Sequence, residues 1–264
     1  MSKRDILARL AVDDQSRMAL ARVLDKAEYA QTRSVPAHSQ FLTDGEQALA
    51  GQALAAAGAG RYRLWGGYEG AERKVCVFLP DWMEDFEPGG EEDPLAAVAV
   101  KAPQDAKLTH RDYLGSLMGL GLDRDGLGDI LTGESGCQVV CLKTLLPTLL
   151  TQWTEAGRHA VQVRALSLGE LKPGERDVKI RRETFQSLRF DAVAAAGFGI
   201  SRAKAASLIS SGRVQLNHLP CAKPDKLLEQ GDSLTAKGLG KCVLARVTGE
   251  SRKGRIMAEM ERYQ

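Results

Sequence analysis

The sequence predicts an α+β protein in three parts: a helical N-terminal region, a ferredoxin-like β-α-β-β-α-β central domain and a small α+β module at the C-terminus. Apolar residues recur at helical spacing near the start of the chain. Strand-like and helix-like segments alternate through the middle, and a helix pair followed by short strands fills the end. We expect the three parts to span residues 1–82, 83–176 and 183–264.

The N-terminal region begins with near-helical spacing of apolar residues from Ile6 to Leu24. An alanine-rich stretch at 45–57 predicts another helix, which a glycine ends. The period then changes to that of strands. We therefore expect a hairpin formed by residues 61–65 and 74–79.

The central domain alternates strand and helix signals. Thr109 is a good N-cap residue for its first helix, and Pro147 falls near the first turn of its second, where proline is tolerated. RNA-recognition domains and many enzymes share this order of elements, so the fold alone does not decide the function. The predicted strands cover residues 95–101, 128–131, 138–142 and 161–166, and the predicted helices cover 109–118 and 143–155.

The C-terminal module follows a polar segment, residues 167–182, whose Pro173-Gly174 pair predicts a linker. Two short helices are expected next, each ended by glycine, with Ser201 as the N-cap of the second. The remaining strands would form a small, mostly antiparallel sheet. The predicted helices cover residues 185–196 and 201–211, and the strands cover 213–216, 233–236, 242–248 and 255–260.

The net charge of +2 hides an uneven distribution along the chain. Residues 177–264 hold 16 Lys and Arg against 9 Asp and Glu, whereas residues 1–176 hold 20 against 25. A basic end on a mildly acidic body suits a polyanionic partner. A soluble surface with uneven charge explains the same counts, so charge alone leaves both interpretations open.

Neither a membrane segment nor a disulfide framework is expected. No apolar run approaches the roughly 20 residues that span a bilayer, and the charged N-terminus is unlike a signal peptide. The five cysteines are odd in number and scattered, which favours buried apolar thiols over disulfides or a zinc site. We expect a cytoplasmic protein without a membrane partner, metal or cofactor.

The start of the second C-terminal helix carries two cations, Arg202 and Lys204. Cations there oppose the helix macrodipole at a cost of roughly 0.3–1 kcal/mol each. A phosphate bound to the helix start would remove this conflict, because the free N–H groups and both cations would bind the same anion. A solvated basic face is the alternative. Ser201 joins this candidate site, and further basic candidates are Arg213, Lys223, Lys241, Arg252, Lys253 and Arg255.

The run from Leu188 to Asn217 resembles the RNA-binding domain first described in a small-subunit ribosomal protein, which recurs in tyrosyl-tRNA synthetases and pseudouridine synthases. This resemblance adds Arg189 and Asn217 to the RNA-binding candidates. His218 departs from the pattern, since glycine is usual after the asparagine. The matching residues are Leu188, Arg189, Asp191, Gly197, Ser201, Arg202, Ala205, Ile209, Gly212, Val214 and Asn217.

Two further segments, residues 66–82 and 108–131, resemble the bacterial YlmH family, so the similarity covers most of the chain beyond residue 40. The resemblance implies a non-catalytic RNA-binding protein with no small-molecule substrate, whose partners are rRNA, tRNA and the large ribosomal subunit. It also implies a role in the rescue of obstructed subunits that still carry peptidyl-tRNA. His110, Arg111 and Arg124 become candidates for RNA contact, although on sequence alone a helix start explains the 109–112 run.

Two other functions stay open: an RNA-modifying enzyme that the C-terminal module targets, and a cell-division-associated adaptor whose basic end is incidental. His110-Arg111-Asp112 lacks the asparagine that a kinase catalytic loop needs, because position 117 is leucine. No catalytic triad, paired-carboxylate signature or metal cluster is visible in the sequence. The predicted central strand has no aromatic residue, so shape and phosphate contacts to folded RNA fit better than base stacking.

Overall fold

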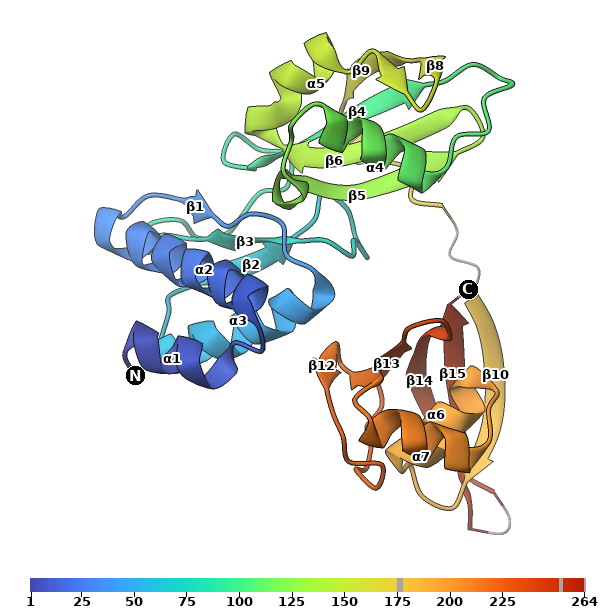
Figure 1. Cartoon of the computed structure of the whole chain (residues 1–264). Coiled ribbons are helices and arrows are strands. Elements are labelled where there is room, and N and C mark those ends of the chain that lie inside the picture. Colours follow the sequence, from blue (N-terminus) through green and yellow to red (C-terminus); the bar gives the residue numbers. More distant parts are fainter. Residues whose placement is uncertain (175–177, 252–253, 264) are drawn as a thin grey trace. The chain divides into compact units, whose positions relative to one another are not determined.

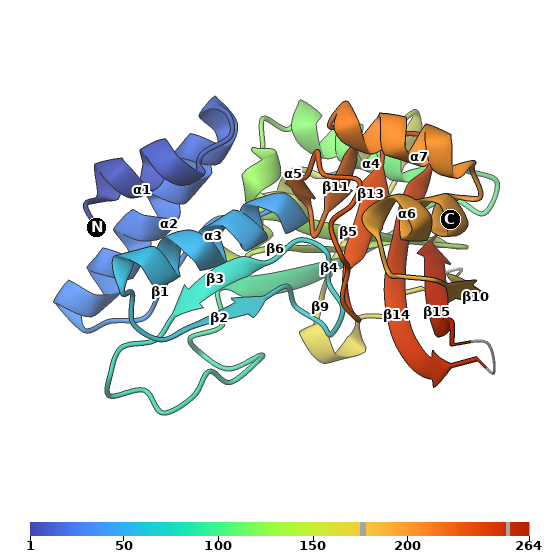
Figure 2. The same cartoon turned by 90° about the horizontal axis from the view of Figure 1, so that it is seen from below.

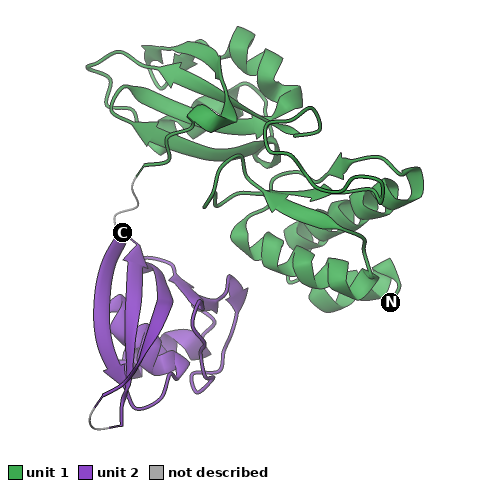
Figure 3. Cartoon of the chain, turned by 180° about the vertical axis from the view of Figure 1, so that it is seen from behind, with its two compact units in different colours: residues 1–174 green, residues 175–264 purple. Residues whose placement is uncertain are grey.

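The computed structural model describes residues 1–174, 178–251 and 254–263. The chain divides into two compact units, residues 1–174 and 175–264 (Figure 3). Both units mix helices with antiparallel sheets, so the predicted α+β class is confirmed.

The first part of unit 1 packs helices on a three-stranded sheet in the order β1-β3-β2 (Figures 1 and 2). The predicted hairpin is present as β2 and β3, and the sequence did not reveal β1, which completes the sheet. Asp13 and Thr43 cap α2 and α3 through capping boxes. The elements are α1 (Lys3–Leu10), α2 (Asp14–Arg33), β1 (Ala37–His38), α3 (Asp44–Ala57), β2 (Tyr62–Trp65) and β3 (Val75–Phe78).

The second part of unit 1 is a four-stranded antiparallel sheet in the order β5-β6-β4-β9. Thr109 begins α4 as predicted, and the second helix starts later than predicted because its first turn, η2, is a 3₁₀-helix. The elements are β4 (Leu95–Lys101), α4 (His110–Gly119), η1 (Arg124–Gly126), β5 (Leu127–Gly133), β6 (Gly136–Leu142), η2 (Lys143–Leu145), α5 (Leu146–Gln152), β7 (Glu155–Ala156), β8 (His159–Ala160), β9 (Gln162–Leu166) and η3 (Leu168–Glu170).

The two faces of this central sheet are covered differently. Because side chains alternate along a strand, Val98 and Val139 point to one face, where they form a core with Tyr113 of α4 and Trp153 after α5. Val140 points to the other face and packs with Phe41 and other residues of the first part of the unit. Residues of the first part of unit 1 cover this face of the sheet only at the end near Leu142. They do not cover the end near Lys101, which is exposed.

Unit 2 packs two helices on a six-stranded antiparallel sheet in the order β10-β15-β14-β13-β11-β12. Helix residues such as Phe190 and Ile209 form the core with sheet residues such as Leu244 and Met260. The elements are β10 (Val178–Phe185), α6 (Phe190–Phe198), α7 (Arg202–Ser210), β11 (Val214–Leu216), β12 (Leu219–Pro220), β13 (Ser233–Ala236), β14 (Gly240–Glu250) and β15 (Ile256–Tyr263).

The linker predicted over residues 167–182 is wrong for its last part. Residues from Val178 onward form β10, which pairs with β15 along its whole length, and Phe185 ends that strand instead of starting a helix. The first module helix therefore begins at Phe190. Charged residues of β10 are exposed at the sheet edge, so the strand lacks the apolar alternation that would have predicted it.

Gly197 of α6 lies close against the sheet of unit 2. A Cβ atom there would overlap Cys242 Sγ and lie 2.7 Å from Met260 Cε, and both of those side chains are buried. We expect Gly197→Ala to destabilise unit 2 by about 1–3 kcal/mol through overpacking. Calorimetric unfolding measures this effect.

Gly115→Ala is the matched control, because Gly115 lies within α4 with no atom within 4 Å of an added Cβ. That change should stabilise the protein by about 0.5–1 kcal/mol through the lower chain entropy of alanine. An equal response to both substitutions would contradict the close packing at Gly197.

Candidate nucleic-acid interface

The start of α7 is tied to the start of α6 by a three-residue ionic network. Asp191 accepts hydrogen bonds from Arg189 on one side, at 3.1 and 3.2 Å, and from Arg202 on the other, at 3.1 Å. Ser201 caps α7 as predicted, and its Oγ accepts from the Lys204 N–H at 3.3 Å. Arg202, the first residue of α7, is therefore tied to the first turn of α6.

The Asp191 carboxylate supplies an internal partner that the sequence did not reveal. Burial of this side chain opposes its ionisation, but the hydrogen bonds and charges of Arg189 and Arg202 outweigh burial and lower the pKa of Asp191 below its usual value. Part of the conflict between Arg202 and the helix dipole is thus relieved within the protein. Two arginines on one carboxylate still leave one positive charge, and the Arg202 side chain stays 58% exposed.

Lys223 lies in a loop that packs against the start of α6. Asp191 N–H donates to the Pro224 carbonyl at 2.9 Å, and Phe190 N–H donates to the Lys226 carbonyl at 2.8 Å. Backbone carbonyls therefore cap α6, while both lysine side chains are exposed. The structure brings this basic loop to the same end of the module as the arginine network.

Two arginines that sequence reasoning missed lie beside the turn between α6 and α7. The Arg181 guanidinium donates to the Ala196 carbonyl at 3.3 Å, and it approaches Gly199 together with Arg262. Arg181 belongs to β10, which the sequence suggested was a linker, and Arg262 belongs to the partner strand β15. The exposed basic residues of β10 were the available signal.

Other predicted basic contacts lie elsewhere in unit 2. Arg213 follows the opposite end of α7 and donates to Ser211 Oγ at 3.2 Å. The Lys241 ammonium lies 5.8 Å from the centre of the Tyr263 ring. Arg255 donates to the Thr184 carbonyl at 2.9 Å, at the sheet edge. Arg252 and Lys253 lie outside the described residues.

Asn217 has a structural role that the sequence did not indicate. Its backbone and that of His218 both have positive φ, the geometry of a type I′ hairpin turn, so histidine occupies the position where glycine is usual. The Asn217 side chain donates to Asp232 at 2.7 Å and accepts from the Ser233 N–H at 2.8 Å. Because both ends of this amide are engaged within the module, we remove Asn217 from the proposed RNA contacts.

Of the three candidates in the central domain, two are exposed and one is engaged within the protein. His110 and Arg111 are exposed in the first turn of α4. The Arg124 guanidinium instead donates to the carbonyls of Leu127 and Gly128, at 2.6 and 2.9 Å. Burial, with Arg73 nearby, lowers the pKa of Arg124 to about 10. Arg124 therefore holds η1 against β5, and we no longer propose it as an RNA contact.

The cysteines behave as small apolar side chains. Four are buried and Cys221 is half-buried. Burial raises the pKa of Cys76 and Cys141 to about 12, which keeps both thiols protonated at neutral pH. The described residues contain no group of three His, Cys, Asp or Glu side chains that could hold a metal ion.

No single helix among the described residues is long and apolar enough to cross a membrane. Only α6 and α7 taken together reach that length and composition, and they bend by 115° at the break between them.

Comparison with known proteins matches the two domains separately. The family model described as "Putative RNA-binding domain in YlmH" matches residues 89–170, and the S4 domain matches residues 188–234. The ribosome-associated protein quality control protein P2 of Bacillus subtilis (strain 168) is 33% identical over 225 residues, 85% of this chain and 86% of that protein. Among solved structures, cell division protein ylmH from Streptococcus pneumoniae is 19% identical with a TM-score of 0.48, covering 60% of this chain and 94% of that chain.

The fold and the matched domains define a chain that joins a YlmH-type central domain to a C-terminal S4 domain. The extent of the similarity to one relative then assigns the chain to a family. The chain belongs to the YlmH family, because it matches the central domain model of that family and is 33% identical to a relative over most of both sequences. The resemblance seen in the sequence is confirmed.

The arginine network should make the module sensitive to acid. Because the folded pKa of Asp191 is lowered, its contribution is present above the unfolded value of about 3.9 and is lost as the pH falls through the folded value. With both arginines partly exposed, we expect Asp191→Asn to cost about 1–2 kcal/mol at pH 7. Amide hydrogen exchange in α6 and α7 at pH 7 and at about pH 2, well below the unfolded value, measures the effect. An equal cost at both pH values would contradict an ionic role.

Proposed function

We propose that this chain is a non-catalytic, cytoplasmic RNA-binding protein that acts on structured rRNA and tRNA at the large ribosomal subunit, in the rescue of stalled peptidyl-tRNA complexes. The observation that carries the proposal is the basic surface at the start of α7, which lies within the matched S4 domain. The Bacillus subtilis relative is named for ribosome-associated quality control, which supports the same assignment.

The geometry of the module supports phosphate binding by charge and shape. The start of α7 presents backbone N–H groups. Lys204 is exposed beside them, and Arg202 is oriented by Asp191. A phosphate at this point would complete the arginine network with a second anion, on the solvent side. Phosphate contacts of this kind fix position without reading sequence, as binding to a folded RNA requires.

The central domain supplies a second surface in this proposal. Its strand order β5-β6-β4-β9 and the packing of α4 and α5 on one face support the ferredoxin-like arrangement that we infer for it. The face of the sheet opposite α4 and α5 is available to a ligand wherever no other segment packs on it. His110 and Arg111, exposed at the start of α4, remain proposed RNA contacts on the helix side.

Cross-linking in living cells tests the proposed partners. Ultraviolet cross-linking of the tagged full chain, followed by sequencing of the attached RNA, should recover large-subunit rRNA and tRNA above a background set by an untagged strain. Recovery of messenger RNA alone, or of no RNA above background, would contradict the assignment.

The proposal gives the chain no catalytic step. Mass spectrometry of nucleosides from ribosomal RNA checks this in a strain that lacks the protein. The modification pattern should be unchanged. Loss of one modified nucleoside, restored by the gene, would instead establish an RNA-modifying enzyme.

A further inference from the structure

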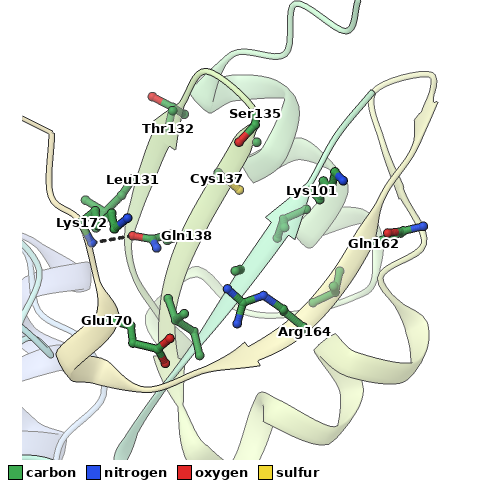
Figure 4. Close-up of a pocket in the computed structure, with 16 residues that line it drawn as sticks. Lys101, Leu131, Thr132, Ser135, Cys137, Gln138, Gln162, Arg164, Glu170 and Lys172 are labelled. Carbon is green, nitrogen blue, oxygen red and sulfur yellow. Dashed lines mark hydrogen bonds between the residues drawn. The ribbon is translucent and has the colours of Figure 1, made fainter. Parts of the chain in front are cut away.

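A groove of about 740 Å³ lies on the face of the central sheet opposite α4 and α5 (Figure 4). It occupies the end of the sheet that the first part of unit 1 leaves uncovered. Strands β4, β5, β6 and β9 form its floor, and the segment after β9 forms one wall. All of its lining belongs to unit 1, so the groove exists independently of unit 2.

Strand register explains why this part of the sheet is hollow. Ala99 of β4 lies between Gln138 of β6 and Arg164 of β9, so a methyl group sits between two long side chains. In the next row on this face, Lys101 lies between Gly136 and Gln162, so the small residue is Gly136. Small residues therefore form the floor, and long polar and charged side chains surround it.

The wall is fixed in place by a hydrogen bond to the floor. The Lys172 N–H donates to Gln138 Oε1 at 2.7 Å, which holds the segment after η3 against the sheet (Figure 4). The Glu170 carboxylate accepts from the Ser167 N–H at 3.1 Å, so it also closes the 3₁₀ turn η3. This wall of the groove is thus anchored to the sheet and closed by its own turn.

The charges in the groove favour an anion. The exposed side chains of Lys101, Arg164 and Lys172 line it and form no ion pair within residues 1–174 or the other described ranges. Glu170 is the one acidic side chain among the lining residues, which gives the lining a net charge of +2. No aromatic side chain lines the groove, so base stacking does not contribute.

We propose that this groove binds the sugar–phosphate backbone of an RNA strand, with Lys101, Arg164 and Lys172 on the phosphates and Gln162 on a ribose hydroxyl. The inference rests on the proposed function and adds to it the surface by which the central domain takes part. The positive lining favours a polyanion, and the proposed function makes that polyanion RNA. The absence of stacking groups makes the contact independent of sequence.

Hydrogen exchange of the full chain with a mixed-sequence RNA of about 20 nucleotides tests the groove directly. Strand β9 is the edge of its sheet, so RNA seated there should slow amide exchange in residues 162–166. The triple substitution Lys101→Gln, Arg164→Gln and Lys172→Gln should abolish this protection. It should also make the salt dependence of binding shallower by about two units, given about 0.7 per lost contact to a single strand.

A charge-matched control uses Arg4→Gln, Arg9→Gln and Arg17→Gln, which remove three positive charges from exposed positions on α1 and α2 of the same unit. This variant should keep the protection of residues 162–166. Ala99→Met tests shape instead of charge, because it fills the floor of the groove. It should weaken the protection without changing the net charge.

The outcomes separate this inference from the proposed function. Protection of the α7 start alone would overturn the groove and leave the proposed function standing. Protection nowhere in the chain would overturn the groove, and the cross-linking experiment would decide the proposed function separately. Protection of residues 162–166 that survives the triple substitution would refute the phosphate contacts. Protection by RNA-free ribosomal proteins, and not by RNA, would assign the groove to a protein partner and overturn the inference.

Discussion

Replacing Arg202 and Lys204 by glutamine is expected to lower the affinity of the full chain for ribosomal RNA by about tenfold or more at 0.1 M salt, and to flatten the salt dependence by about two units. Each cation that binds a phosphate releases counterions, so its loss is visible in the slope as well as in the affinity. Filter binding between about 50 and 200 mM salt measures both quantities.

Among the residues that the structure describes, Arg202 forms an ion pair within the module and Lys204 does not, so the two single variants serve as controls for each other. Lys204 makes no ion pair within the described residues, so Lys204→Gln should flatten the slope by about one unit. Because this change removes a cation from a helix start, it should raise the stability of the module by about 0.3–1 kcal/mol. Arg202 also bonds to Asp191, so its loss should additionally loosen the network. Arg4→Gln with Arg9→Gln removes the same charge from α1. An unchanged slope in the Arg202 and Lys204 double variant would remove the start of α7 from the interface.

The largest expected loss of stability follows from Asp129→Ala. Asp129 Oδ2 accepts from the Tyr68 hydroxyl and from the Glu72 N–H, each at 2.7 Å, and Oδ1 accepts from the Arg73 N–H at 3.0 Å. Its charge also offsets the partly buried guanidinium groups of Arg73 and Arg124. Removing the carboxylate takes away these three hydrogen bonds and one of the negative charges that offset the two guanidinium groups, which should cost about 3–5 kcal/mol.

Tryptophan fluorescence in urea isolates this effect, because Trp65, Trp82 and Trp153 are the three tryptophans of the chain and all lie in unit 1. Asp105→Ala, at an exposed position, should change the unfolding free energy by less than about 0.5 kcal/mol. If Asp129→Ala changed it as little, Asp129 would not join the two parts of unit 1 as the structure indicates.

The elements that the sequence predicted well have local signals. The strand at 95–101 coincides with β4, and Thr109 and Ser201 begin their helices as predicted. Strand β10 carries no such signal. It lies at a sheet edge with charged side chains exposed, and its pairing with β15 joins residues about 80 positions apart.

The part of the candidate site that depends on neighbouring residues was predictable, and the part that depends on distant contacts was not. The cations at the start of α7 follow from helix electrostatics, which depend on a few neighbouring residues. The Asp191 partner, the approach of Arg181 to Gly199 and the internal roles of Asn217 and Arg124 each depend on contacts between distant segments. The groove depends further on sheet register, because Ala99 and Arg164 become neighbours only when β4 and β9 pair.

Co-sedimentation with ribosomal subunits tests the central claim most directly. The full chain is mixed with purified subunits and centrifuged through a sucrose gradient at moderate salt. We expect it to travel with the large subunit, more strongly when peptidyl-tRNA is present, and to dissociate as salt is raised. Migration at the top of the gradient with free protein, or equal binding to both subunits, would contradict the account.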